Sequence, residues 1–268
     1  MLMNRKRASE LGRETVAIVE ARRYTTEAGK DVEIGPLVRR AVESSKTYPP
    51  GYELPLPASS GRTPVINVAN ETTLVAAHRL VDDGYRPAAL NFASAKNPGG
   101  GFLSGARAQE ESLARSSALF ACLDGNPMYE FHRTRRDPKY TDYAIYSPDV
   151  PVIRADDGTL LDEPYLCSFI TCPAVNAKVV LKRDPSRRSE IRKAMDTRVN
   201  KVLAIAAIHG HEALVLGAWG CGVFGNDGRE IADLMGMLTP FHAYRRINVA
   251  LACLRNSLVS KGIDDAEP

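Results

Sequence analysis

The sequence has no long apolar segment. No run of apolar residues approaches the roughly 20 that a membrane-spanning helix needs. Arg5, Lys6 and Arg7 lie near the N-terminus, but the polar stretch ASELGRET follows where a signal peptide would have its apolar core. We therefore exclude a membrane span and expect a cytoplasmic protein with no membrane partner.

The cysteines also lack the pattern of a disulfide framework. They are odd in number and scattered along the chain at Cys122, Cys167, Cys172, Cys221 and Cys253. This pattern predicts reduced thiols. A metal site is not expected, because Cys167 and Cys172 have no second pair of ligands nearby. His209 and His211, between a predicted helix and strand, are expected to be solvent-facing loop residues.

The chain has no large excess of charge of either sign. Its 35 basic and 32 acidic residues leave a formal net charge of +3, and the basic residues are dispersed along the sequence. This balance weakly favours an anionic ligand and argues against a nucleic-acid surface.

Residues 1–60 differ in pattern from the rest of the chain. Helical patterns at 5–23 and 35–45 flank two short β-rich arms around a turn at 27–30. Residues 48–61 are rich in Pro and Gly, which disfavours regular structure and predicts a junction. We expect residues 1–60 to form an N-terminal, largely helical extension packed on the core, and residues 61–268 to form the main domain.

From Thr63 onward, short apolar runs alternate with amphipathic stretches. The predicted extended segments are 64–70, 88–93, 142–153, 165–172, 212–219 and 247–254, and the predicted helices are 73–84, 109–123, 185–209 and 229–238. Such alternation predicts an α/β domain with a mixed, largely parallel sheet between helical layers.

Two glycine-rich loops follow predicted strands. The first glycine loop, residues 94–108, contains three successive glycines, and the second, residues 217–227, reads GAWGCGVFGND. One such loop is most simply a tight connection, but two at the carboxyl edge of a sheet indicate a ligand site for phosphate or ribose. Glycine permits close approach and positive φ, so a branched side chain at Gly222 should disturb the second loop. The GCGVFG pattern favours a pyrophosphate cradle over a nicotinamide site, because the next strand ends with Arg255 and Asn256 instead of an acid.

Glu110 and Glu111 start the predicted helix that follows the first glycine loop. The simplest interpretation is that two acids in a first turn complement the helix dipole. Neighbours on a helix point about 100° apart, so the two cannot act as equivalent carboxylates across one bond. If they act on a substrate, one carboxylate should carry out the chemistry and the other should position it or hold a hydroxyl.

The stretch NPGGGFLSGARAQEE resembles the signature of poly(ADP-ribose) glycohydrolases, in which a triple glycine is followed at short spacing by Gln-Glu-Glu. The stretches LNFASAK and GAWGCGVFGN resemble the shorter, microbial-type branch of that family, and the resemblance covers roughly residues 63–257. It implies a macrodomain-like three-layer sandwich with a mixed central sheet and ADP-ribose in a cleft across the strand ends.

The resemblance also implies roles for individual residues. Glu111 is implied to be catalytic, Glu110 to contact the ribose and set the geometry, and Gln109 to be the third member of the group. The substrate-binding residues expected in the first loop are Asn97, for a ribose hydroxyl, and Gly99, Gly100 and Gly101, beside the scissile bond. Those expected in the second loop are Gly220, Gly222, Val223, Gly225 and Asn226 around the diphosphate, and Phe224 packed on the ribose. Ser94 stands where longer members of the family carry asparagine, and residues 171–176 are further candidates for the cleft.

The implied reaction is hydrolysis of the O-glycosidic ribose–ribose bonds of poly(ADP-ribose), mainly in exo mode, with Glu111 as general acid and then base. It requires no metal or cofactor. The implied partners are poly(ADP-ribose), ADP-ribose and poly-ADP-ribosylated proteins, with a monomeric enzyme and no direct nucleic-acid contact. Two alternatives are a macrodomain that binds ADP-ribose without turnover and a hydrolase of mono-ADP-ribosylated protein or nucleic acid. The intact AQEE stretch favours the glycohydrolase over both.

Overall fold

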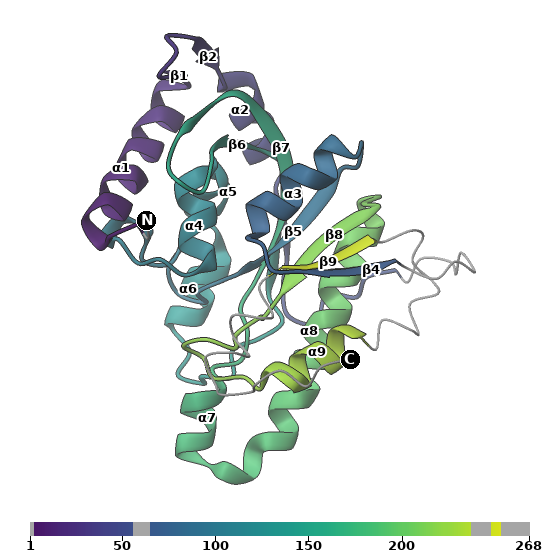
Figure 1. The fold of residues 1–268 in the computed structure, drawn as a ribbon. Coiled ribbons are helices and arrows are strands. Elements are labelled where there is room, and N and C mark those ends of the chain that lie inside the picture. The colour runs from purple at the N-terminus through teal and green to yellow at the C-terminus, as the bar shows by residue number, and fades with distance from the viewer. Residues whose placement is uncertain (1–2, 56–64, 237–247, 253–268) are drawn as a thin grey trace.

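The structure is a computed structural model that describes residues 3–55, 65–236 and 248–252. Its centre is a seven-stranded sheet with the strand order β3-β6-β7-β5-β8-β9-β4 (Figure 1). In that order the strands are β3 (Lys46–Tyr48), β6 (Ala144–Arg154), β7 (Leu160–Cys172), β5 (Pro87–Phe92), β8 (Ala213–Gly217), β9 (Asn248–Ala252) and β4 (Ile66–Ala69). The pairings of β6 with β3 and β7 are antiparallel, and those from β7 to β4 are parallel. The expected mixed, largely parallel sheet is confirmed.

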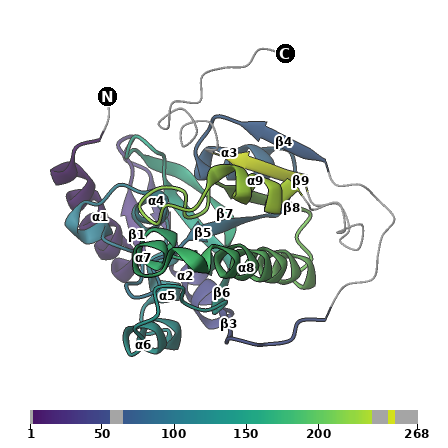
Figure 2. The ribbon, with the colours of Figure 1, turned by 90° about the horizontal axis from the view of Figure 1, so that it is seen from below.

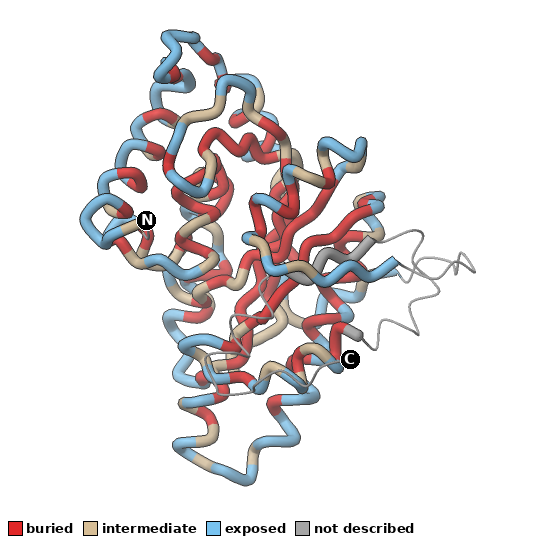
Figure 3. The backbone as a smooth tube through the Cα atoms, viewed as in Figure 1, coloured by how far each residue is buried: buried red, intermediate tan, exposed pale blue. Residues whose placement is uncertain are grey.

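Helices cover both faces of this sheet. Along β5, Ala88 and Leu90 belong to one buried cluster, whereas Ala89 between them belongs to the other, as the two-residue period of a strand requires. The first cluster joins the sheet to α7 (Ala177–Arg183), α8 (Arg188–Ile208) and α9 (Gly228–Gly236). The second joins it to α1 (Arg5–Ala21), α2 (Gly35–Glu43), α3 (Thr73–Asp82), α4 (Gln109–Ser116), α5 (Leu119–Leu123) and α6 (Pro127–Arg133). Strands buried on both faces read as apolar runs, and Figure 3 shows them as the buried centre of the fold.

The N-terminal segment is joined to the core at several points. After α1, the hairpin of β1 (Arg23–Thr25) and β2 (Asp31–Glu33) leads into α2, and then β3 pairs with β6 at the edge of the central sheet. The three-residue strand β3 was not predicted, because so short an edge strand has no recognisable alternation. The boundary expected between residues 60 and 61 lies outside the described residues, so the division into two domains stays a prediction.

Helix α1 packs directly on the first glycine loop. Ser9 Oγ donates to the Leu103 carbonyl over 2.6 Å, and Arg5 Nε donates to the Ser104 carbonyl over 3.0 Å. Further along the helix, Gly12 approaches Phe102 so closely that an added Cβ would lie 3.0 Å from the Phe102 carbonyl oxygen. The helix therefore supports from behind the loop that carries the triple glycine.

The single helix predicted over residues 109–123 is wrong. It divides into α4 and α5, because Ser117 adopts an extended conformation and bridges to Val152 of β6. Ser117 Oγ donates to the Leu113 carbonyl, and the Ala118 N–H donates to the Pro151 carbonyl. A serine that bonds its own helix offers the backbone an alternative to the next turn, and the strand contact fixes that alternative.

The expectation of solvent-facing histidines at the end of α8 is also wrong. The His209 ring stacks on Tyr146 with centroids 3.7 Å apart, and its Nε2 lies 2.7 Å from the Tyr48 hydroxyl of β3. His211 is buried, with Nε2 2.7 Å from the Tyr146 hydroxyl and Nδ1 2.9 Å from the Arg86 carbonyl. Burial lowers the pKa of His209 to about 4 and also lowers that of His211, so both rings are neutral near pH 7.

The cysteines of the described residues are buried, and none of them forms a disulfide. Burial raises the pKa of the Cys122 thiol to about 11, so this side chain is a protonated, apolar-packing group. Cys253 lies outside the described residues. In the described ranges no helix combines the length and the apolar character needed to cross a bilayer.

Candidate active site

A cavity of about 560 Å³ opens at the carboxyl ends of the neighbouring parallel strands β5 and β8. Its wall is formed by residues 72–74 before and in α3, 92–94 after β5, 107–113 at the start of α4, and 218–224 after β8 except residue 221, together with Asp156 and Ala174. Both glycine loops therefore contribute to one site, as the sequence predicted. This edge is where open α/β sheets bind ligands.

Glu110 and Glu111 lie in the first turn of α4 and are buried, with exposed fractions of 4% and 9%. The residue before the helix, Ala108, provides no side-chain cap, so the acids meet a helix terminus whose N–H groups are not satisfied by a cap. Burying two carboxyl groups without hydrogen-bond partners costs free energy. The favourable interaction of an ionised carboxylate with the helix dipole is smaller than the free energy needed to bury it. A role limited to complementing the dipole does not explain this burial.

The triple glycine holds Glu111. The Gly101 N–H donates to Glu111 Oε1 over 2.9 Å. Gly100 has a φ of +60°, and a Cβ on it would lie 2.3 Å from Glu111 Oε1 and 3.0 Å from Glu110 Oε2. A side chain at position 100 therefore cannot coexist with the carboxyls where they lie. Glu111 Oε2 is buried without a hydrogen-bond partner among the described residues, and Glu111 lines the cavity.

Glu110 is held on the opposite side by the start of the same loop. Its Oε2 accepts from the Ser94 N–H over 2.6 Å, whereas its buried Oε1 has no hydrogen-bond partner within the described part of the chain. Burial raises the pKa of Glu110 well above its ordinary value, and the nearby charge of Glu111 adds to this effect. The hydrogen bond from Ser94 opposes the shift. Glu110 therefore retains a proton at a higher pH than an exposed glutamate.

Gln109 ties the helix to the sheet. Its Oε1 accepts from the Phe92 N–H over 2.9 Å, and its Nε2 donates to the Leu90 carbonyl over 2.7 Å and to Thr73 Oγ1 over 3.1 Å. The side chain thus hydrogen-bonds the last residues of β5, beyond those that pair with β8, and fixes the start of α4. Gln109 also lines the cavity, but its amide is already engaged by the protein.

Asn97 and Ser94 shape the first glycine loop. Ser94 Oγ accepts from the N–H groups of Lys96 and Asn97, and the Asn97 carbonyl accepts from the Gly100 N–H over 3.0 Å. Asn97 is exposed and is not part of the cavity wall, whereas Ser94 is. A Cβ added to Gly99, Gly100 or Gly101 would meet Phe102, Ser104, Ala106, Ala114 and the two carboxyls, and the place of these glycines beside a ribose stays a prediction.

The second glycine loop presents main-chain donors to the cavity. In the described part of the chain, the N–H groups of Gly220, Gly222, Val223 and Phe224 donate to no protein acceptor. Val223 is 84% exposed, and Phe224 is half-buried on the cavity wall, with its ring 6.1 Å from that of Tyr140. A row of free N–H groups on a concave wall is a typical anion cradle.

The positions of the second glycine loop differ in whether the fold requires glycine there. Gly220 (φ +73°) would place a Cβ 2.6 Å from the Ala174 Cβ, and Gly225 (φ +66°) would place one 3.2 Å from the Lys178 Cβ. Gly222 has no positive φ, and a Cβ on it would meet nothing within 4 Å. The expected backbone reason for Gly222 is therefore wrong, and any restriction there would come from a ligand.

Asn226 holds the second loop from behind. It is 2% exposed, and its Nδ2 donates to the carbonyls of Val175 over 2.7 Å and Gly220 over 3.1 Å. Neither Asn226 nor Gly225 forms part of the cavity wall, so their contacts position the loop. Of residues 171–176, only Ala174 lines the cavity.

The cavity also includes residues that the sequence did not single out. Thr72 and Asp156 line it side by side, with Thr72 Oγ1 2.5 Å from Asp156 Oδ2. Arg107 lines it as well, and its Nη1 donates to the Met3 carbonyl over 2.7 Å. Arg107 stands two residues before Gln109, so its closeness to the Gln-Glu-Glu motif could have indicated a place in the site. Asp156 has no sequence signal that connects it to the glycine loops. No group of three potential His, Cys, Asp or Glu metal ligands occurs in the described ranges.

Comparisons with known proteins agree with this architecture. Residues 12–155 match the family model for the microbial-type PARG (poly(ADP-ribose) glycohydrolase) catalytic domain. A comparison with curated proteins found no match.

Several solved structures are similar over nearly the whole chain. The poly(ADP-ribose) glycohydrolase of Thermomonospora curvata has 47% sequence identity and a TM-score of 0.86, over 91% of this chain and 92% of that one. Its complex with the inhibitor ADP-HPD has 43% identity and a TM-score of 0.84, over 95% and 98%. The enzyme of Deinococcus radiodurans in complex with ADP-ribose has 36% identity and a TM-score of 0.74, over 86% and 99%. The family model covers more than half of the chain and these matches extend over most of it, so the chain belongs to the microbial-type poly(ADP-ribose) glycohydrolases, a family of glycosidases.

Proposed function

We propose that this protein hydrolyses the ribose–ribose O-glycosidic bonds of poly(ADP-ribose) and releases ADP-ribose, with Glu111 as the general acid and base. The observation that carries this proposal is the carboxyl of Glu111, a residue that lines the cavity at the strand ends. Gly101 holds its Oε1, and its Oε2 is buried without a hydrogen-bond partner among the described residues. A domain that only bound ADP-ribose would have no need of a buried pair of acids. The complexes of relatives with ADP-ribose and with ADP-HPD support the same ligand class here.

Each element of the site has a task in this reaction. Cleavage proceeds through an oxocarbenium-like transition state, and the departing ribose oxygen must be protonated. Glu111 donates that proton and then, as a carboxylate, accepts one from the attacking water. The free N–H groups of residues 220 and 222–224 hold the diphosphate, and Phe224 packs on the ribose next to it.

Glu110 positions the ribose and keeps a proton in the pair. The raised pKa of Glu110 keeps its carboxyl protonated to a higher pH than that of an exposed glutamate, and in this form it donates a hydrogen bond to a ribose hydroxyl. The different contacts of the two acids support distinct tasks for them.

Glu111→Gln should nearly abolish turnover, because the amide keeps the shape of the side chain but cannot deliver a proton. General acid–base groups typically contribute about 10²- to 10⁴-fold to a rate. Release of ADP-ribose from automodified polymer measures activity, with mono-ADP-ribosylated protein as a second substrate, and calorimetry measures ADP-ribose binding, which should persist. Degradation of polymer by this variant at a near wild-type rate would remove Glu111 from the mechanism.

Gly100→Ala should lower turnover by about 10²-fold, because its Cβ displaces the Glu111 carboxyl and a shift of about 1 Å in a reacting group has an effect of that size. The matched control is Gly84→Ala. Gly84 also has a positive φ (+83°), but a Cβ on it meets nothing within 4 Å. The control therefore carries the same backbone strain of about 1 kcal/mol without the collision. Equal losses of activity in the two variants would attribute the effect to stability alone.

Glu110→Gln should stabilise the protein above pH 7 while it impairs activity. The folded pKa of Glu110 is raised, so its carboxyl favours folding in acid, and that contribution is lost as pH rises from the ordinary value through the folded one. The gain in unfolding temperature should therefore be larger at pH 8 than at pH 5. In the control variant Glu190→Gln, the change in unfolding temperature should have the opposite sign. Hydrogen bonds from Arg187 and Lys139 lower the pKa of that exposed carboxyl. A Glu110→Gln shift that is independent of pH would contradict the raised pKa.

Cleavage should proceed mainly from chain ends and leave the last protein-linked unit in place. The N-terminal segment supports this proposal, because α1 and Met3 hold the first glycine loop and Arg107 at the rim of the cavity. Gel analysis of a time course should show free ADP-ribose from the earliest points. Early accumulation of fragments of intermediate length would show internal cleavage instead.

A further inference from the structure

Two segments far apart in the sequence have a high net positive charge. Residues 133–139 and 178–193 contain eleven basic and three acidic residues, a net charge of +8, whereas the whole chain has a net charge of only +3. The sequence suggested dispersed charge because the two segments are about 40 residues apart. The rest of the protein is correspondingly acidic, so the fold has a strong charge asymmetry.

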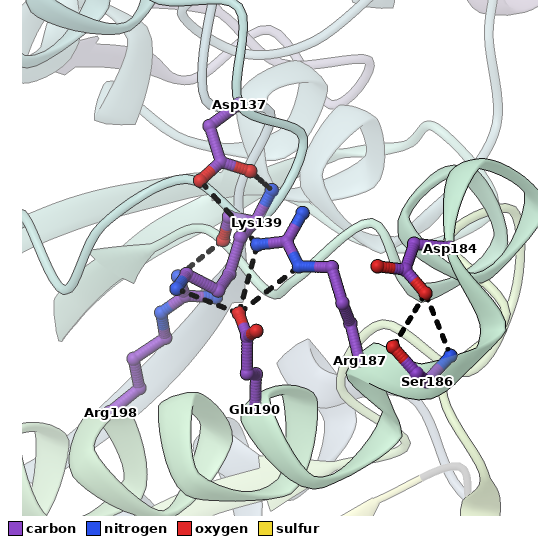
Figure 4. A network of polar contacts seen from close by, with 7 residues as sticks. All are labelled: Asp137, Lys139, Asp184, Ser186, Arg187, Glu190 and Arg198. Atoms are coloured by element: carbon purple, nitrogen blue, oxygen red, sulfur yellow. Dashed lines mark hydrogen bonds and ion pairs between the residues drawn. The ribbon is translucent and has the colours of Figure 1, made fainter.

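The fold brings these segments together into one surface, here named the basic surface and defined as residues 133–139 and 178–193. Arg183 Nη1 donates to the Arg136 carbonyl over 3.2 Å, and Lys139 Nζ lies 3.3 Å from Glu190 Oε2. Figure 4 shows the loop at 137–139 lying against the start of α8, with ion pairs between Lys139 and Glu190 and between Asp137 and Arg187. In Figure 1, α7 and the beginning of α8 form the lower end of the molecule. In Figure 2, which shows the molecule from below, this end faces the viewer.

The basic surface touches both loops of the active site. Arg133 Nε donates to the Lys96 carbonyl in the first glycine loop over 2.9 Å. On the other side, the Lys178 N–H donates to the Phe224 carbonyl in the second glycine loop over 2.8 Å. The basic surface is therefore continuous with the rim of the cavity.

Within the described ranges, only four of the eleven basic side chains form ion pairs with carboxylates, namely Arg133, Lys139, Arg187 and Arg188. Glu190 pairs with Lys139 and Arg187, and the Asp184 carboxylate accepts from the Ser186 hydroxyl and N–H. Among the described residues, no carboxylate forms an ion pair with a set of exposed side chains, namely Arg136, Lys178, Lys182, Arg183, Arg192 and Lys193. The Arg135 guanidinium lies 3.3 Å above the Phe131 ring and is also exposed.

We propose that the basic surface binds the ADP-ribose units of the polymer that lie outside the cavity, next to the unit that is being cleaved. This proposal rests on the proposed function. Each unit carries a diphosphate, so the chain that leaves the cavity is a regular polyanion, and it must cross the rim to which the basic surface is joined. Opposite charge along this path attracts long chains and raises their rate of association. No residue of the basic surface belongs to the cavity wall, so binding of a single ADP-ribose in the cavity should not depend on it.

The test is a variant with three neutralising substitutions, Arg136→Gln, Lys182→Gln and Arg192→Gln, which changes none of the residues of the cavity wall. The matched control removes the same charge from α1 and α2 at the other end of the fold, through Lys6→Gln, Arg13→Gln and Arg39→Gln, which are exposed and form no ion pair with described residues. At low salt the KM for long polymer should rise about 3- to 10-fold in the first variant with unchanged kcat. The KM for the two-unit oligomer, ADP-ribose affinity and the control variant should stay near wild type, and high salt should abolish the difference for long polymer.

Several outcomes would overturn the proposal. One is an unchanged KM for long polymer, and another is an equal rise in the control variant. Loss of ADP-ribose affinity in the first variant would place the effect inside the cavity. Binding of single-stranded DNA that the three substitutions abolish, with polymer degradation unaffected, would assign the basic surface to nucleic acid. Wild-type protein that cleaves neither substrate would instead refute the proposed function, which keeps the two failures distinct.

Discussion

The hydrogen bond from the Gly101 main chain to Glu111 is the constraint on which the active site depends. A carboxyl can be held by backbone at this distance only if the adjoining residue has no side chain, because a Cβ on Gly100 would occupy the place of Glu111 Oε1. These glycines are therefore needed to make room for the protein's own carboxyls, before any contact with a ligand is considered. With Oε1 fixed in this way, Oε2 is left buried and without a hydrogen-bond partner among the described residues, in a residue that lines the cavity. What the site can do depends on the placement of this one carboxyl.

Much of the site could be predicted from the sequence because its parts are local. Residues 94–111 contain the first glycine loop and both glutamates, and the second loop follows a strand that is the direct neighbour of β5. Alternating strands and helices with parallel pairing bring such loops to one edge of a sheet. The layers, the sheet type and the joint placement of the loops follow from these patterns alone.

What could not be predicted depends on contacts between distant segments. The break at Ser117 arises from pairing with β6, and the tasks of Gly222 and Asn226 differ because only one of them faces open space. Asp156 reaches the cavity from a turn after β6, which no local pattern marks. The basic surface could not be predicted from the sequence either. Its two segments are separate along the chain and form one surface only because α7 and α8 pack beside the loop after α6.

The position of α1 has a consequence for how the chain folds. Its hydrogen bonds to Leu103, Ser104 and Arg115 join residues that are 94 to 100 positions apart, and β3 pairs with a strand that is synthesised about as much later. Loops of this length form slowly, because closing them costs conformational entropy before their contacts stabilise the fold. During synthesis α1 therefore lacks its partners in the first glycine loop and α4 until residues 103–115 emerge. The helix that supports the loop is made first and packs against it only later.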